Sequence, residues 1–181
     1  MAGVPLHDVW AVDVPPARSG VTLDEFLRAA GSRMHRPSRV VRGLLGLRFF
    51  IGRFFGWDDA AAERSARSFA DRLTAADRAA SLVPPGTKDG PFRVVYRLPG
   101  EQLAELINKT AHAAALSALV ETAAGYRFYF AVYVEPVSRL TPVYLALIDP
   151  FRKLVVYPSL LRGIRANWER TISAVPAEAP R

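Results

Sequence analysis

The chain has 181 residues, of which 50% are hydrophobic, enough for one domain with a buried core and too few for two domains of ordinary size. It carries 24 basic and 17 acidic residues, a formal net charge of +7, and only Lys88, Lys109 and Lys153 among the basic residues are lysine. Arginine suits bidentate contacts with carboxylate or phosphate groups. The lack of cysteine excludes disulfides, thiolate metal sites and a cysteine nucleophile.

The N-terminal region predicts a strand and then a helix. Residues 1–11 lack the basic start and apolar run of a signal peptide, so we expect a cytoplasmic protein. A short apolar run over residues 9–14 ends at Pro15 and predicts a strand. Thr22 and Glu25 have the spacing of a capping box, so a helix should begin there.

A second helix is predicted between residues 37 and 57, apolar on nearly every side and therefore buried. Residues 32–57 also hold six arginines and no acidic residue, which suits a helix on an anionic membrane surface. We favour a core helix with a solvated basic stripe and keep weak membrane-surface contact as the alternative. Arg48 falls on the apolar side, where a guanidinium needs a carboxylate or a ligand anion.

Residues 58–90 are rich in alanine with mixed charge, and they predict a connection more than a domain. A surface helix is expected over residues 60–73, and Thr74 with Asp77 predicts the cap of a further short helix. A functional lid and a plain surface excursion both remain open for this segment.

The sequence period changes to two from Phe92 onward, which predicts a strand over residues 92–98. Alanine and leucine between residues 101 and 120 favour a helix by propensity. The alternation and the flanking strands instead favour two strands, residues 103–108 and 111–122, followed by a clear strand over residues 126–135. The small alanines would leave space on one sheet face, as a cavity requires.

The C-terminal region predicts a broken amphipathic helix. Thr141 and Asp149 each precede a proline, which is the pattern of an N-cap followed by the first helical residue. We therefore expect a helix in two pieces or one helix with a break, with a further kink at Pro158. Asp149 is interpreted as a helix cap. Apolar residues at three-and-four spacing between residues 144 and 168 should form one face that covers the sheet.

The same region resembles a family signature. It fits a Y-x-x-x-I-x-P-F-[HR] pattern through Tyr144, Ile148, Pro150, Phe151 and Arg152. This pattern is similar to that of a bacterial family of uncharacterised proteins, and the resemblance also covers Leu47-Arg48, the spacing of Glu105, Asn108 and His112, and Tyr133-Val134. Some relatives are joined to NAD-dependent oxidoreductases, but this chain has no glycine-rich phosphate loop, and no cofactor is expected.

The family resembles the START-like superfamily, in which an antiparallel sheet grips a long C-terminal helix around an apolar cavity. The resemblance implies an α+β, helix-grip domain over residues 1–173, with additional N-terminal helices and a disordered tail over residues 174–181. Members of that superfamily bind lipids, sterols or polyketides, and some catalyse cyclisation or dehydration.

Two functions follow as hypotheses. The first is a carrier or sensor for a small hydrophobic or amphipathic molecule, with predicted contacts from Arg48, Asn108, Phe128, Phe130 and Tyr144. The second is a small cyclase- or dehydratase-type enzyme in the same cavity, in which His112 acts as general acid or base and Glu105 orients it. The alternative for His112 is a buried histidine bonded to a backbone carbonyl.

Other partners and sites are constrained more weakly. His7 and His35 stand alone in the sequence, so a zinc site made of three histidines is not expected. No nucleic-acid-binding module is recognisable despite the positive charge, so no nucleic-acid partner is expected. The oligomeric state is open, and a homodimer is compatible with the sequence.

Overall fold

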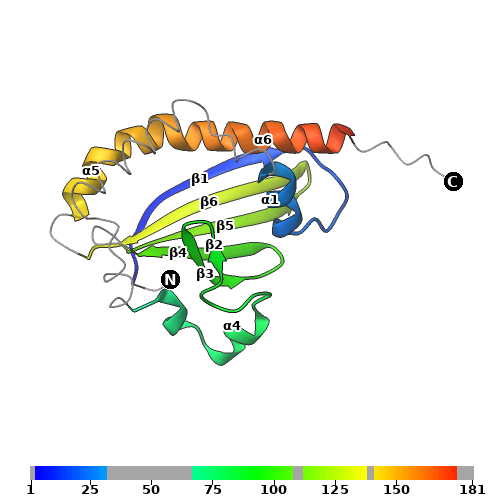
Figure 1. The fold of residues 1–181 in the computed structure, drawn as a ribbon. Helices are drawn as coiled ribbons and strands as arrows, with labels where there is room; N and C mark the ends of the chain where they lie inside the picture. Colours follow the sequence, from blue (N-terminus) through cyan, green and yellow to red (C-terminus); the bar gives the residue numbers. More distant parts are fainter. Residues whose placement is uncertain (1–2, 32–66, 108–111, 138–140, 175–181) are drawn as a thin grey trace.

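Six strands form one antiparallel sheet in the order β1-β6-β5-β4-β3-β2 (Figure 1). The computed structural model of the protein describes residues 3–31, 67–107, 112–137 and 141–174. The strands are β1 (Leu6–Val14), β2 (Lys88–Asp89), β3 (Phe92–Arg97), β4 (Glu101–Ile107), β5 (His112–Thr122) and β6 (Gly125–Glu135). The expected α+β class with an antiparallel sheet and a long C-terminal helix is confirmed.

The alanine-rich region forms strands, as the alternation predicted and against its helix propensity. β4 and β5 pair over their whole lengths, from Glu101 opposite Ala118 to Ile107 opposite His112. On the other side of β5, Ala114 lies opposite the large side chain of Tyr133 and is fully buried. Cross-strand pairing of small with large residues therefore uses the space that the alanines leave.

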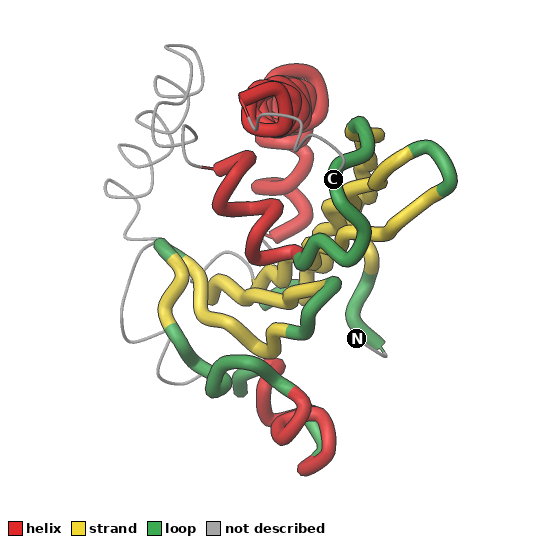
Figure 2. The backbone as a smooth tube through the Cα atoms, turned by 90° about the vertical axis from the view of Figure 1, so that its right-hand side faces the viewer, coloured by secondary structure: helices red, strands yellow, loops and turns green. Residues whose placement is uncertain are grey.

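The two faces of the sheet are covered by different elements (Figures 1 and 2). Helices α1 (Leu23–Gly31) and α6 (Tyr157–Ala174) pack on one face, here called the helix face, through a core that includes Phe26, Phe128 and Trp168. The short 3-10 helix η1 (Phe69–Arg72) packs on the opposite face, called the η1 face. Helix α4 (Ala75–Ala80) follows η1 and buries none of its residues.

Both predicted capping boxes are present. The backbone N–H of Thr22 donates to the Glu25 carboxylate at 3.0 Å, and the Glu25 N–H donates back to the Thr22 hydroxyl at 3.3 Å. Thr74 and Asp77 make the same reciprocal pair at the start of α4. These bonds satisfy backbone donors that have no partner within the helix.

The C-terminal helical segment runs without interruption from Thr141 to Ala174, which corrects the predicted break. It consists of α5 (Thr141–Phe151), a π-helical stretch η2 (Arg152–Val156) and α6. Pro150 lies inside α5 and does not end it. The N–H of Tyr157 donates to the carbonyl of Arg152, five residues back, so a widened turn accommodates the prolines on either side without breaking the helix.

The predicted apolar face covers the sheet only in part. Leu161, Ile164 and Trp168 are buried against it. Leu147, Phe151 and Leu154 are 63%, 51% and 77% exposed. In Figure 1 the outer end of α5 extends past the ends of the strands.

Two further elements differ from the prediction, and some predicted features lie outside the described residues. The helix expected over residues 60–73 is replaced, from Phe69 onward, by the 3-10 helix η1, and the short strand β2 was not predicted. The helix over residues 37–57, Arg48, Asn108 and residues 175–181 lie outside the described residues, as does the side chain of Tyr144. Among the helices that are described, none has the length and hydrophobicity needed to cross a bilayer.

Candidate functional site

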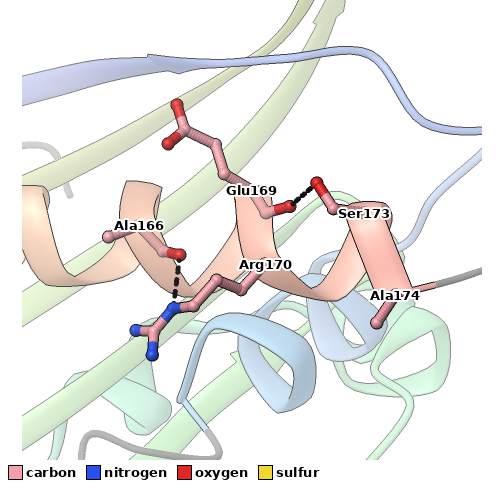
Figure 3. A pocket seen from close by; sticks show the side chains of 5 residues that line it. All are labelled: Ala166, Glu169, Arg170, Ser173 and Ala174. Atoms are coloured by element: carbon pink, nitrogen blue, oxygen red, sulfur yellow. Dashed lines mark hydrogen bonds between the residues drawn. The ribbon is translucent and has the colours of Figure 1, made fainter.

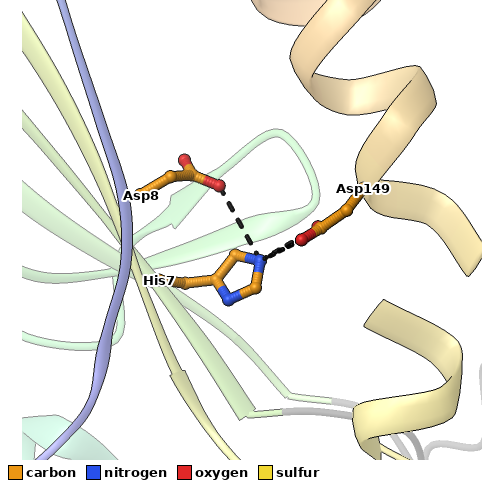
Figure 4. A group of neighbouring side chains, drawn as sticks. All are labelled: His7, Asp8 and Asp149. Carbon is orange, nitrogen blue, oxygen red and sulfur yellow. Dashed lines mark hydrogen bonds and ion pairs between the residues drawn. The ribbon is translucent and has the colours of Figure 1, made fainter. Parts of the chain in front are cut away.

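A β-bulge in the first strand brings two neighbouring polar residues to one place. The register of β1 against β6 shifts between Leu6 and Asp8, so His7 is the extra residue. Successive side chains of a regular strand point to opposite faces, whereas a bulge re-aims one of them. As a result His7 and Asp8 both approach Asp149 of α5 (Figure 4).

The C-terminal helix supplies the other half of this group. His7 Nε2 lies 2.9 Å from both carboxylate oxygens of Asp149, and it carries the hydrogen because a carboxylate only accepts. Arg152 donates through Nη1 to Asp149 at 3.0 Å and through Nη2 to Asp8 Oδ2 at 3.1 Å. Its Nε donates to the hydroxyl of Tyr157 at 2.8 Å. We call His7, Asp8, Asp149, Arg152 and Tyr157 the polar junction.

Two cations, Arg152 and the neighbouring Lys153, face the two carboxylates of the polar junction. Asp8 and Asp149 face the guanidinium of Arg152, and the ammonium of Lys153 lies 3.2 Å from Asp149. Burial raises the pKa of Asp149, but hydrogen bonds from His7 and Lys153 and the charge of Arg152 outweigh it, so that pKa lies below its ordinary value. Burial also raises the pKa of the Tyr157 hydroxyl to about 12, so this hydroxyl accepts from Arg152 in its neutral form.

Two polar atoms beside the polar junction have no hydrogen-bond partner within the described part of the chain. They are Asp8 Oδ1, an acceptor, and Trp10 Nε1, a donor, and both are buried. The side chain of Asp8 is only 9% exposed. In Figure 4 the carboxylate oxygen of Asp8 that is not joined to His7 points away from it, so His7 is not the hydrogen-bond partner of Oδ1. A buried polar atom without a partner costs about 1–3 kcal/mol, so these two atoms call for an explanation.

Aromatic rings form an apolar wall next to these atoms. Asp8 and Trp10 are two residues apart on β1 and therefore share the helix face. The rings of Trp10 and Phe130 lie 5.3 Å and 5.8 Å from the ring of Tyr157, centroid to centroid. Val132 completes this small apolar cluster under η2. Polar and apolar surface thus meet at the contact between β1 and the helix.

A metal centre fits this arrangement poorly. His7, Asp8 and Asp149 each offer one ligand atom, and these atoms lie within 4.8 Å of one another. Both carboxylates are nevertheless already paired with Arg152, and a divalent cation would meet the fixed positive charges of Arg152 and Lys153. His7, which is isolated from other histidines in the sequence, is brought to Asp149 by the fold.

The predicted catalytic pair lies on the other side of the sheet. Glu105 lies opposite Ala114, which packs with Phe69 on the η1 face. His112 is two residues from Ala114 on β5 and therefore shares that face. The predicted ligand contacts Phe128 and Phe130 lie on the helix face, so the pair does not share a sheet face with them. His112 Nε2 lies 2.9 Å from Glu105 Oε2, so the two side chains are hydrogen-bonded to each other.

Both residues are fully occupied by neighbouring groups. The second ring nitrogen of His112, Nδ1, lies 3.5 Å from Glu135. The ring of Phe69 stacks on the imidazole with centroids 3.7 Å apart, and the Phe69 N–H donates to Glu105 at 2.8 Å. Ser68 donates its hydroxyl to the other Glu105 oxygen. We call these five residues the η1 clamp, because they hold η1 against the sheet.

The hydrogen bonds of the η1 clamp stabilise the charged form of Glu105. Burial alone would raise the pKa of this carboxyl. Hydrogen bonds donated by His112, Ser68 and the Phe69 N–H lower it by more, so the pKa lies below its ordinary value. A buried histidine bonded to a backbone carbonyl was the expected alternative to catalysis. The structure shows a buried histidine bonded to a carboxylate instead.

Two of the predicted ligand contacts, Phe128 and Phe130, lie in different surroundings. Phe128 is 2% exposed and packs against Phe26, with ring centroids 5.3 Å apart, inside the core under α1 and α6. Phe130 is only partly buried and belongs to the aromatic wall beside Trp10. Phe130 thus lies next to the polar junction, and Phe128 does not.

Sequence reasoning missed most of the polar junction. His7, Asp8, Trp10 and Tyr157 were not singled out as site residues, and Asp149 was assigned to a cap. One signal was available: Asp149, Arg152 and Tyr157 all lie in or just after the signature segment. The bulge that turns His7 toward them has no such signature in the sequence.

A surface hollow of about 490 Å3 lies elsewhere, beside the end of α6 (Figure 3). It is lined by Ala166, Glu169, Arg170, Ser173 and Ala174. Arg170 and Ser173 bond backbone carbonyls of the same helix at 3.0 Å and 2.8 Å. Because all the lining residues come from one helix, this hollow is an open surface and supports no ligand argument.

Comparison with family models matched residues 1–159 to the family described as Protein of unknown function (DUF2867). The comparisons with curated proteins and with solved structures found no match. The matched range contains the whole sheet and every residue of the polar junction. This result confirms the predicted membership of an uncharacterised family: the chain belongs to the DUF2867 family of proteins of unknown function.

Proposed function

We propose that the protein binds a small amphipathic molecule where β1 meets the C-terminal helix, and that it acts as a carrier or sensor. The observation that carries this proposal is the pair of buried, unpartnered atoms Asp8 Oδ1 and Trp10 Nε1. Buried polar groups in folded proteins are nearly always hydrogen-bonded, so exceptions call for an explanation. A ligand that bonds both atoms supplies one.

The local backbone supports the same location. A β-bulge at His7 and the π-helical stretch η2 face each other across the site. Both irregularities are frequent at functional sites, because each re-aims side chains that a regular element would point elsewhere. Ion pairs from Arg152 hold Asp8 and Asp149 in place before any ligand arrives, which lowers the ordering cost of binding.

The START-like resemblance is part of this proposal. In that superfamily a sheet and a long C-terminal helix enclose an apolar ligand, and here too the proposed ligand lies between the sheet and the C-terminal helix. The ligand is placed at the β1 edge, since the centre of the helix face is filled by Phe26, Phe128 and Trp168.

Native mass spectrometry of the protein purified from its own host tests the proposal. We expect a retained small molecule in the wild-type protein and its loss in Asp8→Asn and Trp10→Phe. Asp13→Asn is the matched control, because Asp13 lies on the same strand but is exposed and paired with Arg127. A mass equal to the bare chain, together with no binding of added amphipathic compounds at Trp10, would refute the proposed function.

The enzymatic alternative at His112 and Glu105 is less well supported. A general acid or base needs a ring nitrogen that can reach substrate. Both nitrogens of His112 already face carboxylates, and Phe69 covers the ring. These contacts favour a role in holding η1 to the sheet.

A further inference from the structure

Building on the proposed binding site, we infer that its ligand presents a neutral group that both donates and accepts a hydrogen bond. A hydroxyl or a primary carboxamide on an otherwise apolar molecule meets this description. The inference names the chemical class of the ligand, which the proposed function leaves open.

Hydrogen-bond complementarity is the first argument. Asp8 Oδ1 can only accept, because its carboxylate is held by Arg152, and Trp10 Nε1 can only donate. The two residues share one face of β1, where side chains two positions apart have Cα atoms roughly 6.6 Å apart. One hydroxyl or one primary carboxamide, each of which both donates and accepts, matches this acceptor and this donor.

The pairing of charges in the polar junction is the second argument. Asp8 and Asp149 are already paired with Arg152 and Lys153, so neither carboxylate is left for a ligand cation and neither of these cations for a ligand anion. A carboxylate could accept from Trp10 but would be repelled by Asp8. An ammonium could donate to Asp8 but has no acceptor for Trp10.

The aromatic wall defines the remainder of the ligand. The rings of Trp10, Phe130 and Tyr157 pack around one another, and Val132 lies with them. Such a surface favours an apolar body beside the polar group and disfavours a sugar-like molecule with hydroxyls on every side. The predicted ligand is thus a neutral alcohol or amide with an aliphatic or aromatic body.

A matched set of cyclohexane derivatives tests this inference: cyclohexanol, cyclohexanecarboxamide, cyclohexanecarboxylate and cyclohexylamine. The readout is the Trp10 Nε1–H resonance in two-dimensional 1H–15N spectra of the full chain, assigned by its loss in Trp10→Phe. Trp168 Nε1 already donates to the Pro15 carbonyl at 3.0 Å and serves as an internal control that should not move.

Cyclohexanol and the carboxamide should shift the Trp10 signal saturably, with affinities about tenfold or more above those of both charged probes, because each charged probe forfeits one hydrogen bond. In Asp8→Asn the preference over the carboxylate should shrink, while Asp13→Asn should keep it. The unchanged Trp168 signal reports that each variant is folded.

The opposite outcomes are distinguishable. Tighter binding of a charged probe at Trp10 would overturn the inferred head group and leave the proposed site intact. If no probe moves the Trp10 signal and its Nε1–H shows only a cross peak to water, a bound water serves both atoms, and the site and the head group both fail.

Discussion

His7 Nε2 lies 2.9 Å from both carboxylate oxygens of Asp149, although 142 positions separate the two residues in the chain. This contact joins the beginning of the sheet to the middle of the C-terminal helical segment. It does so at the β-bulge and one turn before η2. The same few residues that connect the two elements also border the proposed ligand site.

Removing this contact should weaken the fold. We expect His7→Ala and Asp149→Asn each to lower the free energy of unfolding by about 1–3 kcal/mol, since a hydrogen bond involving a charged group is lost in a half-buried place. In a double-mutant cycle measured by urea unfolding, the two changes should couple by more than about 0.5 kcal/mol. Strict additivity would contradict a direct interaction.

The control for this cycle is the exposed pair of Asp13 and Arg127. Its atoms are as close, 2.6 Å, yet both side chains are largely in solvent. Surface ion pairs contribute little because solvent screens them, so Asp13→Asn should cost less than Asp149→Asn.

The η1 clamp should behave as a structural unit. His112→Ala leaves the buried Glu105 without one of its hydrogen-bond donors and should cost about 1–3 kcal/mol. Combining His112→Ala with Glu105→Gln should cost less than the sum of the single changes, because the charge that lacks this donor is then absent. Binding of cyclohexanol at Trp10, on the opposite face, should change less than about twofold in any folded variant. An unchanged unfolding midpoint in His112→Ala would contradict the clamp.

The lowered pKa of Glu105 predicts how this contribution depends on pH. Because the native pKa lies below the ordinary value of 4.5, the stabilisation is complete above that value and is lost as pH falls through the native pKa. The stability difference between wild type and Glu105→Gln should therefore be largest near pH 7 and shrink toward about pH 3. Urea unfolding across this range measures it, and a difference that grows in acid would contradict the sign of the shift.

Gly125 should not tolerate a side chain. Its φ is +136°, and an added Cβ would lie 2.5 Å from the carbonyl oxygen of Val14 on β1. Gly125→Ala should therefore cost at least about 1–3 kcal/mol. Gly163→Ala is the matched control, since nothing lies within 4 Å of that position in α6, and it should stabilise by about 0.5–1 kcal/mol. Thermal unfolding of both variants decides the comparison.

Phe128 and Phe130 should differ in what their removal affects. Phe128→Ala empties a core position that is 2% exposed and should lower stability by about 3–5 kcal/mol. Phe130→Ala removes part of the aromatic wall and should weaken cyclohexanol binding at Trp10 more than it lowers stability. Equal binding by wild type and Phe130→Ala would place the ligand elsewhere.

Local signals in the sequence were sufficient for much of the fold. Alternation predicted β3 to β6 to within about two residues, and the Thr22–Glu25 and Thr74–Asp77 patterns located two helix starts. These features depend on side chains a few positions apart, so short stretches contain the information. The spacing of Glu105 and His112 only suggested a possible pair, and the contact between their side chains is seen in the folded chain.

Local sequence patterns did not determine on which sheet face each residue lies or which group it contacts there. The tertiary structure decided both. His112 and Phe130 are both strand residues with inward positions, yet they lie on opposite faces, because the registers of two strand pairs set their relation. The sequence indicated that Asp149 is a helix N-cap. In the structure it lies inside a continuous helix, and its carboxylate accepts a hydrogen bond from His7. The bulge at His7 and the convergence of β1 with η2 arise from long-range packing, which no local pattern encodes.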